Sequence, residues 1–489
     1  MAANLFYKLP KELISLIFKA MDSTKDLLNL ILASRHCQKI FAEAPNIVLL
    51  RRLKSAVPPL LWSEFCAANF VLSNFHPVTD PNLLGADEEN MDAFLERYFG
   101  PPDAAFELPR SMESVAAAHK LHCAISSSIV DLTQKMALEA HRLCGSIDDD
   151  SDDSDQESQT EGGLCDEASL ETKISETEQV RLYRAFLRFE IYARLFRPAH
   201  RDGEVQDYQG ETQFRKFLSH FAPWEVEEIT TVHQYLADIV ENSMEEMDRD
   251  FEAEVRRLAA KAAREKAMRQ TPAPAYAWTN FAQMDATPLL QFSNEHRWVS
   301  IGYVSSITAS GIVYLSAFAR SDKTARFTCL RRLNDTWGPF LTDALPSHYV
   351  GGKPVFGFST TRPRRRFVPF NPFREVPAPV GPPDGSPESP TAPNQGYVCH
   401  MARTGGYLQV ADLKWAQLRQ LGCVFWDAAR LGTGVLREAI CEVEHGNYVP
   451  RVAAFPRMGR APEGAINHIR LPVGDYWRLE QEFGALRAE

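Results

Sequence analysis

The sequence lacks the cysteine spacing of a disulfide-stapled or zinc-binding chain. Nine cysteines are scattered over 489 residues, their number is odd, and no two of them form a CxxC pair. Small secreted domains and structural zinc sites need cysteines at short, paired intervals. The pattern instead indicates free, mostly buried thiols in a reducing compartment. We therefore predict an intracellular protein, cytoplasmic and/or nuclear.

Long apolar runs and an excess of basic residues are missing as well. No uncharged apolar stretch reaches the roughly 18 residues that a membrane span requires. The opening residues, MAANLFYKLPKEL, hold no basic segment followed by an apolar run, so we expect no secretory signal. Lysine and arginine number 53 against 64 acidic residues, a net charge of -11. General nucleic-acid binding needs a basic face, so we expect neither nucleic acid nor membrane as a partner.

Motifs of the common enzyme classes are absent too. The chain contains no GxxxxGK[ST] phosphate loop, no GxSxG nucleophile elbow and no HExxH zinc motif. His119, His122 and Cys123 lie close together, with His141 and Cys144 one helix length later, so a metal site is geometrically possible. Their intervals match no zinc finger, and half-buried side chains of an amphipathic helix are the favoured alternative. We predict no catalytic residue, no cofactor and no metal.

What the sequence does contain is the composition of a globular protein with several parts. Hydrophobic residues make up 45% and charged residues 24% of the chain, as in ordinary globular domains. An acidic, serine-rich segment and a basic, proline-rich segment interrupt helical patterns, and we expect both to be disordered insertions. The predicted parts are a helical module at 1–53, a helical region at 54–145, an acidic linker at 146–178, a helical body at 179–361, a basic and proline-rich linker at 362–395, and a C-terminal helical piece at 396–489 that packs on the body.

The first fifty residues carry the clearest helical pattern. Pro10 suits the first turn of a helix, where its missing N–H is not needed. Ser23 and Asp26 have capping-box-like spacing, which starts a second helix, and Pro45 stops a third. The apolar stripes of the first two helices are Leu13, Leu16, Ile17, Ala20, Leu27, Leu30 and Ile31. Three short helices are marginal alone, so this unit needs a partner or the rest of the chain to cover its apolar faces.

The run from Leu9 to Leu53 resembles the F-box motif. The match includes Leu9-Pro10, Asp26-Leu27 and Pro45, and it departs from the common pattern at Cys37 and Val48, where tryptophan is frequent. F-box modules dock on the Skp-type adaptor of a cullin–RING ubiquitin ligase. The adaptor contacts that the resemblance implies here are Leu9, Pro10, Leu13, Ile17, Leu30 and Leu32.

Three later segments resemble, in the same order, those of a large group of filamentous-fungal F-box-like proteins. Residues 176–197 are hydrophobic on nearly every face, which is typical of a central buried helix. Its arginines are expected to snorkel or to pair with Glu190 and other acids. Residues 221–236 form an amphipathic helix, and 418–431 hold an apolar patch around Trp426. The resemblance implies a mostly helical body behind an F-box-like start.

The sequence thus predicts a mainly α protein: a three-helix F-box-like module joined to a larger irregular helical domain. Segment 298–333 contains β-branched runs, yet the spacing of its leucines favours helix. The expected function is substrate recruitment within a cullin–RING ligase, with the Skp-type adaptor and an unidentified protein substrate as partners. The alternative is a self-contained helical scaffold whose F-box-like segment binds no adaptor. Exposure of Leu9, Pro10, Leu13 and Ile17 would favour adaptor docking.

Overall fold

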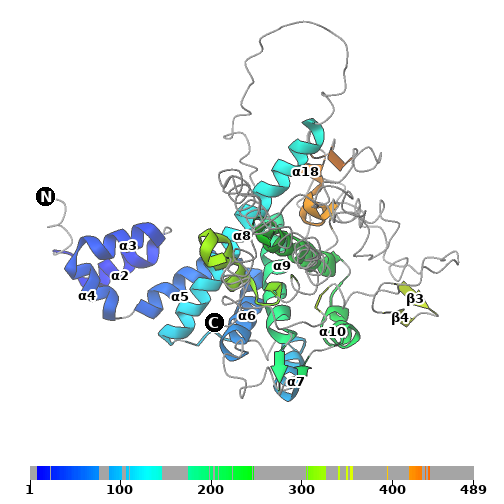
Figure 1. Ribbon diagram of the computed structural model, residues 1–489. Coiled ribbons are helices and arrows are strands. Elements are labelled where there is room, and N and C mark those ends of the chain that lie inside the picture. The colour runs from blue at the N-terminus through cyan, green and yellow to red at the C-terminus, as the bar shows by residue number, and fades with distance from the viewer. Residues whose placement is uncertain are drawn as a thin grey trace, which may run out of the picture.

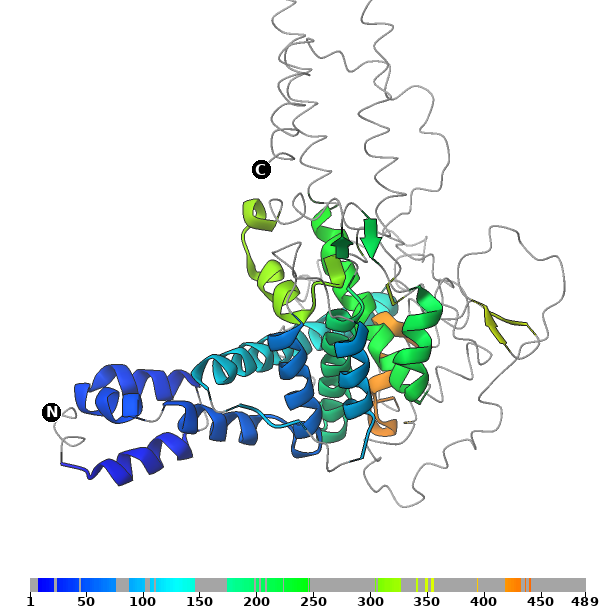
Figure 2. The ribbon, with the colours of Figure 1, turned by 90° about the horizontal axis from the view of Figure 1, so that it is seen from below.

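The computed structural model describes, in the main, residues 8–75, 88–145, 174–246 and 304–326, with shorter stretches at 340–341, 348–355, 394 and 418–440. These residues form a mainly α fold, as predicted, in which four strands of three residues are the only described β-structure. A small group of helices at the N-terminus stands at one end of a larger helical body (Figures 1 and 2). No described helix combines the length and apolar character that crossing a bilayer requires.

Four helices make up the N-terminal part of the chain: α2 (Lys11–Ala20), α3 (Thr24–Ala33), α4 (Arg35–Glu43) and α5 (Pro45–Ala56). Pro10 is the N-cap of α2, one position before the expected first turn. Pro45 follows the end of α4, as predicted, and also begins a helix that the sequence pattern did not predict. The fixed φ of proline suits this first helical position.

The N-terminal module, defined as α2, α3, α4 and the first half of α5, has a small core of its own. Its buried members are Ile14, Phe18, Leu27, Cys37, Ile40 and Val48. The rings of Phe18 and Phe41 meet edge to face, with centroids 6.0 Å apart. Cys37 and Val48, the two departures from the F-box pattern, both lie in this core. Helix α5 joins the module to the body, because Val48 belongs to the small core and Leu53 to the large one.

The body is built from helices of very different length. Residues 224–244 form one further helix. The body also contains two antiparallel strand pairs, β1 (Ala199–Arg201) with β2 (Glu204–Gln206) and β3 (His348–Val350) with β4 (Lys353–Val355). The other elements are η1 (Pro59–Leu61), α6 (Trp62–Asn74), α7 (Glu88–Tyr98), α8 (Met112–Gly145), α9 (Glu176–Leu195), α10 (Gly210–Lys216), η5 (Leu218–His220), α14 (Ile312–Arg320), η6 (Cys423–Phe425) and α18 (Ala428–Leu431).

Helix α9 is the central helix of the body, as its sequence predicted. It packs against α6, α8, α14 and η6, and its residues are buried on every face. Ser175 caps its first turn: the Ser175 hydroxyl accepts from the N–H of Glu178, and the Glu178 carboxylate accepts from the N–H of Ser175. This cap lies inside the predicted acidic linker, so the linker boundary at 178 is wrong. Residues 146–173 lie outside the described part of the chain.

Four arginines of α9 pair with carboxylates, which confirms the expected pairing with Glu190 and other acids rather than snorkelling. Long cationic side chains snorkel where water is within reach, and around α9 other helices occupy that space. Burial by itself would lower the pKa of Arg188, but Glu64, Tyr98 and Glu225 outweigh burial and raise it. The N···O distances are 2.5 Å for Arg181–Asp427, 2.7 Å for Arg184–Glu228, 2.7 Å for Arg188–Glu64 and Arg188–Glu225, and 2.8 Å for Arg194–Glu190.

Glu190 also fixes the start of α14. Its carboxylate is fully buried and accepts from the backbone N–H of Ile312 at 2.5 Å. Gly311 precedes this residue with φ at 84°, and a Cβ atom there would lie 2.6 Å from the Glu190 carboxylate. Glycine is therefore required both by the backbone conformation and by the close approach. Helix α14 confirms the helical interpretation of 298–333 for the part that is described.

The other segments with predicted helical or apolar patterns meet around α9. In the helix at 224–244, Ile229, Val232 and Leu236 are buried, as the spacing predicted. The apolar patch of 418–431 is buried as well, in η6 and the residue after it. Of the predicted proline-rich linker, only Asn394 is described; its amide donates to the carbonyl of Val424 at 2.8 Å. Most of the predicted C-terminal piece also lies outside the described residues.

Candidate interaction surface

Helix α2 is apolar on two faces, and only one of them is used inside the module. Ile14 and Phe18, four residues apart, point into the small core and are fully buried. Leu13 and Leu16 lie on another side of the helix and remain 46% and 54% exposed. Half-buried Ile17 continues this outward stripe. A helix of an ordinary monomer seldom leaves such a stripe in water, so it is the first candidate for a partner surface.

The residues that the F-box resemblance implies as adaptor contacts divide into two groups. Pro10, Leu13 and Leu32 are exposed, with Leu13 at 46% and Leu32 at 69%. Leu9, Ile17 and Leu30 are half-buried, and Leu9 and Leu30 also pack against the small core of the module. None of the six is buried. They are therefore available to a partner, although the half-buried ones can offer only part of their surface.

Two exposed apolar side chains of the module were not among the expected contacts. Leu16 belongs to the apolar stripe that helical spacing predicts, so the same spacing could have added it. Ile47, 53% exposed, lies in the first turn of α5, and no signal pointed to it because that helix was not expected.

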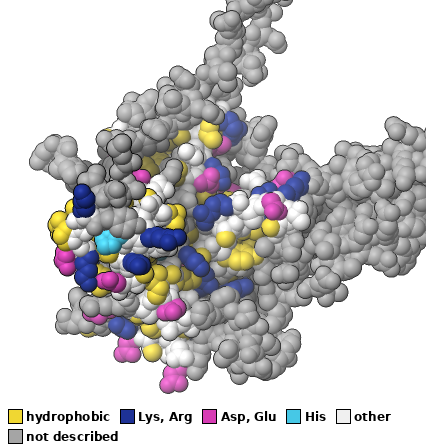
Figure 3. All heavy atoms as spheres, turned by 90° about the vertical axis from the view of Figure 1, so that its left-hand side faces the viewer, with side chains coloured by type: hydrophobic (Ala, Val, Ile, Leu, Met, Phe, Trp, Pro, Cys, Tyr) yellow, Lys and Arg dark blue, Asp and Glu magenta, His cyan; other side chains and the backbone are white. Residues whose placement is uncertain are grey.

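The module that carries this apolar surface also holds exposed basic side chains. Figure 3 shows lysine and arginine side chains beside hydrophobic ones on the face of the molecule that carries the module. Lys8, Lys11, Arg35 and Lys39 are exposed. Residues 8–50 contain six basic and four acidic residues, although the whole chain has a net charge of -11. The module thus has a small net positive charge in an anionic protein.

The histidine and cysteine cluster of α8 does not assemble a metal site. His119 Nδ1 lies 3.4 Å from the sulfur of Cys123, and His122 Nδ1 lies 2.9 Å from the Tyr183 hydroxyl. Burial, with a smaller contribution from His119, lowers the pKa of His122 to about 4, so this imidazole is neutral. His141 lies 22 residues after His119 on the same helix, which places it roughly 33 Å from His119. The described residues contain no group of three metal-binding side chains.

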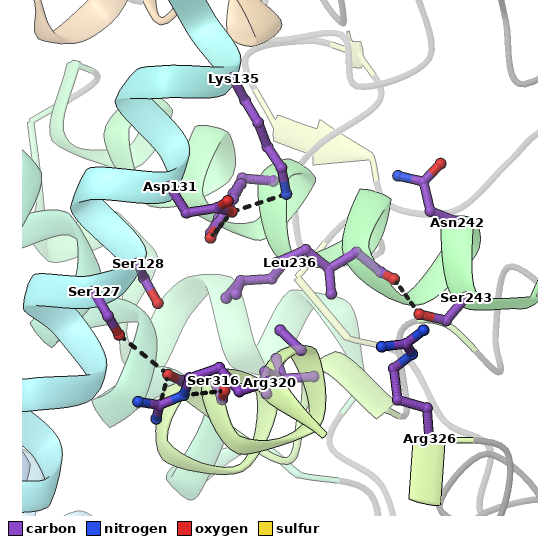
Figure 4. A pocket seen from close by; sticks show the side chains of 14 residues that line it. Ser127, Ser128, Asp131, Lys135, Leu236, Asn242, Ser243, Ser316, Arg320 and Arg326 are labelled. Carbon is purple, nitrogen blue, oxygen red and sulfur yellow. Dashed lines mark hydrogen bonds and ion pairs between the residues drawn. The ribbon is translucent and has the colours of Figure 1, made fainter. Parts of the chain in front are cut away.

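A second feature is a hollow between α8, α14 and the helix at 224–244 (Figure 4). Its volume is about 330 Å³, and Leu236, Ile239 and Leu315 supply apolar surface to it. The Tyr235 hydroxyl donates to the carboxylate of Asp131 at 2.7 Å. Burial raises the pKa of Tyr235, and the hydrogen bond to Asp131 adds to the effect.

Comparison with known proteins adds no assignment to either feature. The chain matches no protein-family model, no curated protein and no solved structure.

Proposed function

We propose that the chain is a substrate-recruiting F-box subunit of a cullin–RING ubiquitin ligase. The N-terminal module would bind a Skp-type adaptor through the surface formed by Leu9, Pro10, Leu13, Ile17, Leu30 and Leu32. The body would present a protein substrate. In this role the chain performs no covalent chemistry, because it positions a substrate for catalysis by its partners.

The observation that carries the proposal is an apolar surface left open on a module whose core is already complete. Ile14 and Phe18, on the face of α2 that points into the small core, are buried, and yet Leu13 stays 46% and Leu32 69% exposed. Burying apolar surface contributes roughly 25 cal/mol per Å², so these side chains hold binding free energy that the fold itself leaves unused. A helical module with this property is suited to dock on a partner through its helix faces.

Charge and architecture support the same role. The small net positive charge of the module suits a partner whose own face is apolar with acidic residues at its margin. Helix α5 belongs to both cores through Val48 and Leu53, so a partner bound to the module is held at a defined position relative to the body. Defined placement is what a substrate-recruiting subunit has to provide.

A pull-down of the full-length protein with a purified Skp-type adaptor tests the proposal. The informative variant is the double substitution Leu13→Glu and Leu32→Glu, because both side chains are exposed and the fold tolerates charge there. The matched control is Leu138→Glu, on α8, where the leucine is 56% exposed and outside the module. We expect the adaptor to be retained by the wild type and by the control, and lost by the double variant.

Failure of the folded wild-type protein to retain the adaptor would overturn the proposal. The alternative would then account better for the chain: a helical scaffold protein in which α5 fixes the module to the body as a structural extension. Equal retention by the double variant would show that binding uses another surface, and the named contacts would be wrong.

A further inference from the structure

The hollow beside α8 has a cationic wall with one arginine that no described carboxylate neutralises. Three cations line it: Lys135 from α8, Arg320 from the end of α14, and Arg326 from the residues after α14. Lys135 pairs with Asp131 at 2.8 Å, and Arg326 pairs with Glu246 at 2.8 Å. For Arg320 no carboxylate partner occurs among the described residues. Asp131 lines the hollow as well, so the positive charge that no described carboxylate pairs with is that of Arg320, and it is suited to an anionic group.

Arg320 is held in place, although it is exposed. Its Nε donates to the carbonyl of Ser316 at 2.9 Å, and Nη2 donates to the Ser316 hydroxyl at 3.0 Å. The Ser316 hydroxyl in turn lies 3.3 Å from that of Ser127 on α8. Figure 4 shows these contacts on one side of the hollow, with Lys135 and Arg326 on other sides of it. A pre-positioned guanidinium loses less side-chain entropy when it binds an anion.

The hollow also has an apolar part and an open side. Leu236 and Leu315 are buried at its base, and Ile239 borders it. Its volume of about 330 Å³ is at the small end of ligand pockets, and such pockets enclose most of a small-molecule ligand. The hollow is open to solvent on one side. It suits a side chain that projects from a larger partner.

We infer that this hollow binds a peptide segment of the protein substrate in which an acidic side chain, a carboxylate or a phosphate, lies next to an apolar one. The acidic group would meet the Arg320 guanidinium, which the Ser316 carbonyl and hydroxyl hold in place, and the apolar neighbour would lie on half-buried Ile239. The inference deepens the proposed function, because it rests on the body recruiting a protein and names the feature that the body recognises.

Fluorescence anisotropy with the full-length protein tests this inference. The probes are three fluorescein-labelled nonapeptides that repeat the frame glycine–leucine–X three times, with X as glutamate, glutamine or phosphoserine. At low ionic strength we expect the glutamate or the phosphoserine peptide to bind about tenfold more tightly than the glutamine peptide. The tighter of the two identifies which acidic group the hollow prefers.

The decisive variant is Arg320→Gln, and its control Arg35→Gln removes the same charge from the exposed surface of the module. Arg320→Gln should abolish the preference for the acidic peptides, and Arg35→Gln should keep it. The inference is overturned if no peptide binds, if the glutamine peptide binds equally well, or if Arg320→Gln keeps the preference.

The adaptor-binding variant separates this inference from the proposed function. Leu13→Glu with Leu32→Glu should leave peptide binding unchanged, because both leucines belong to the module and the hollow belongs to the body. Acidic-peptide preference without adaptor retention would keep the hollow as the recognition site of a scaffold protein. Adaptor retention without peptide preference would overturn the hollow alone.

Discussion

The two ends of the described fold handle polarity in opposite ways. Around α9 the body buries charges: Arg184 and Glu228 are 3% and 1% exposed and bind each other. The N-terminal module keeps its ion pair in water, with Lys11 and Glu43 60% and 59% exposed, and leaves leucines exposed beside it. The body therefore pairs its charges in its interior, whereas the module leaves both charged and apolar side chains in contact with water.

This difference predicts which residues contribute to the stability of the fold and which contribute to partner binding. In the body, a buried arginine and carboxylate depend on each other, since either one alone would be an uncompensated charge in a low-dielectric surrounding. In the module, the exposed charges contribute little to stability and the exposed leucines contribute little until a partner covers them. Substitution of a buried ion-paired residue of the body should thus affect folding, and substitution of the exposed leucines of the module should affect binding.

The largest effect is expected for Arg184→Met. The Arg184 guanidinium donates to both oxygens of Glu228, at 2.7 and 2.8 Å from Nη2, and methionine would leave that carboxylate without this cation. We expect the free energy of unfolding to fall by about 3 to 5 kcal/mol, measured by urea denaturation followed by circular dichroism. The control Lys11→Met breaks the exposed pair and should change it by less than about 1 kcal/mol. Similar losses for both variants would contradict the comparison.

A somewhat smaller effect, confined to one end of the molecule, is expected for Phe18→Ala. Phe18 is fully buried in the small core and packs edge to face on Phe41. Removing it should destabilise the module by about 3 kcal/mol while the body stays folded. Hydrogen exchange should show lost protection in α2 and α3 and unchanged protection in α9. Equal loss in α9 would mean that the module and the body unfold as one unit.

Asp238 tests what the partial burial of a carboxylate costs the stability of the body. It lies half-buried in the helix at 224–244, where burial raises its pKa to about 6 from 3.8, although a hydrogen bond from Gln234 lowers it in part. A carboxyl whose folded pKa is raised costs stability as the pH rises from about 4 through 6, because the unfolded state loses its proton first.

Asp238→Asn removes that cost. At pH 7 we expect the variant to be more stable than the wild type by about 1 to 2 kcal/mol, a value reduced for partial solvent screening. At pH 4 the two proteins should have nearly equal stability. Urea denaturation at both pH values measures this, and a stabilisation that does not depend on pH would show that ionisation of Asp238 is not its cause.

The smallest effect on stability, with the largest on partner binding, is expected for Leu13→Glu with Leu32→Glu. Both side chains are exposed, so the free energy of unfolding should change by no more than about 0.5 kcal/mol per site. Thermal unfolding of the free protein measures this alongside the adaptor pull-down. A large destabilisation would mean that these leucines are packed in solution and would count against an open docking surface.

Much of the fold was predictable because its signals are local. Helical spacing predicted α2, α3 and α4, and the all-round hydrophobicity of 176–197 predicted a central helix. Helix α5 was missed because Pro45 was treated only as a helix stop, although proline is equally suited to begin a helix. The predicted acidic linker also ran on to 178, across the capping box of Ser175 and Glu178 that starts α9.

The candidate surface was predictable only in part. The F-box resemblance selected residues of α2, of α3 and of the two positions before α2, and none of them is buried. Helix α2 carries apolar residues on two sides, so its pattern alone does not say which side faces the core. Packing decided it: Ile14 and Phe18 meet Leu27, Cys37 and Ile40 inside, and Leu13 is left outside.

The mainly helical class, the helical elements at the N-terminus and the central helix follow from local sequence, because periodicity and capping act over a few residues. Which charges meet depends on tertiary packing. Arg181 pairs with Asp427, 246 residues away, and the hollow brings Ser127 within 3.3 Å of Ser316. No local pattern encodes such partners, since they depend on how distant helices pack, and packing is a property of the whole chain.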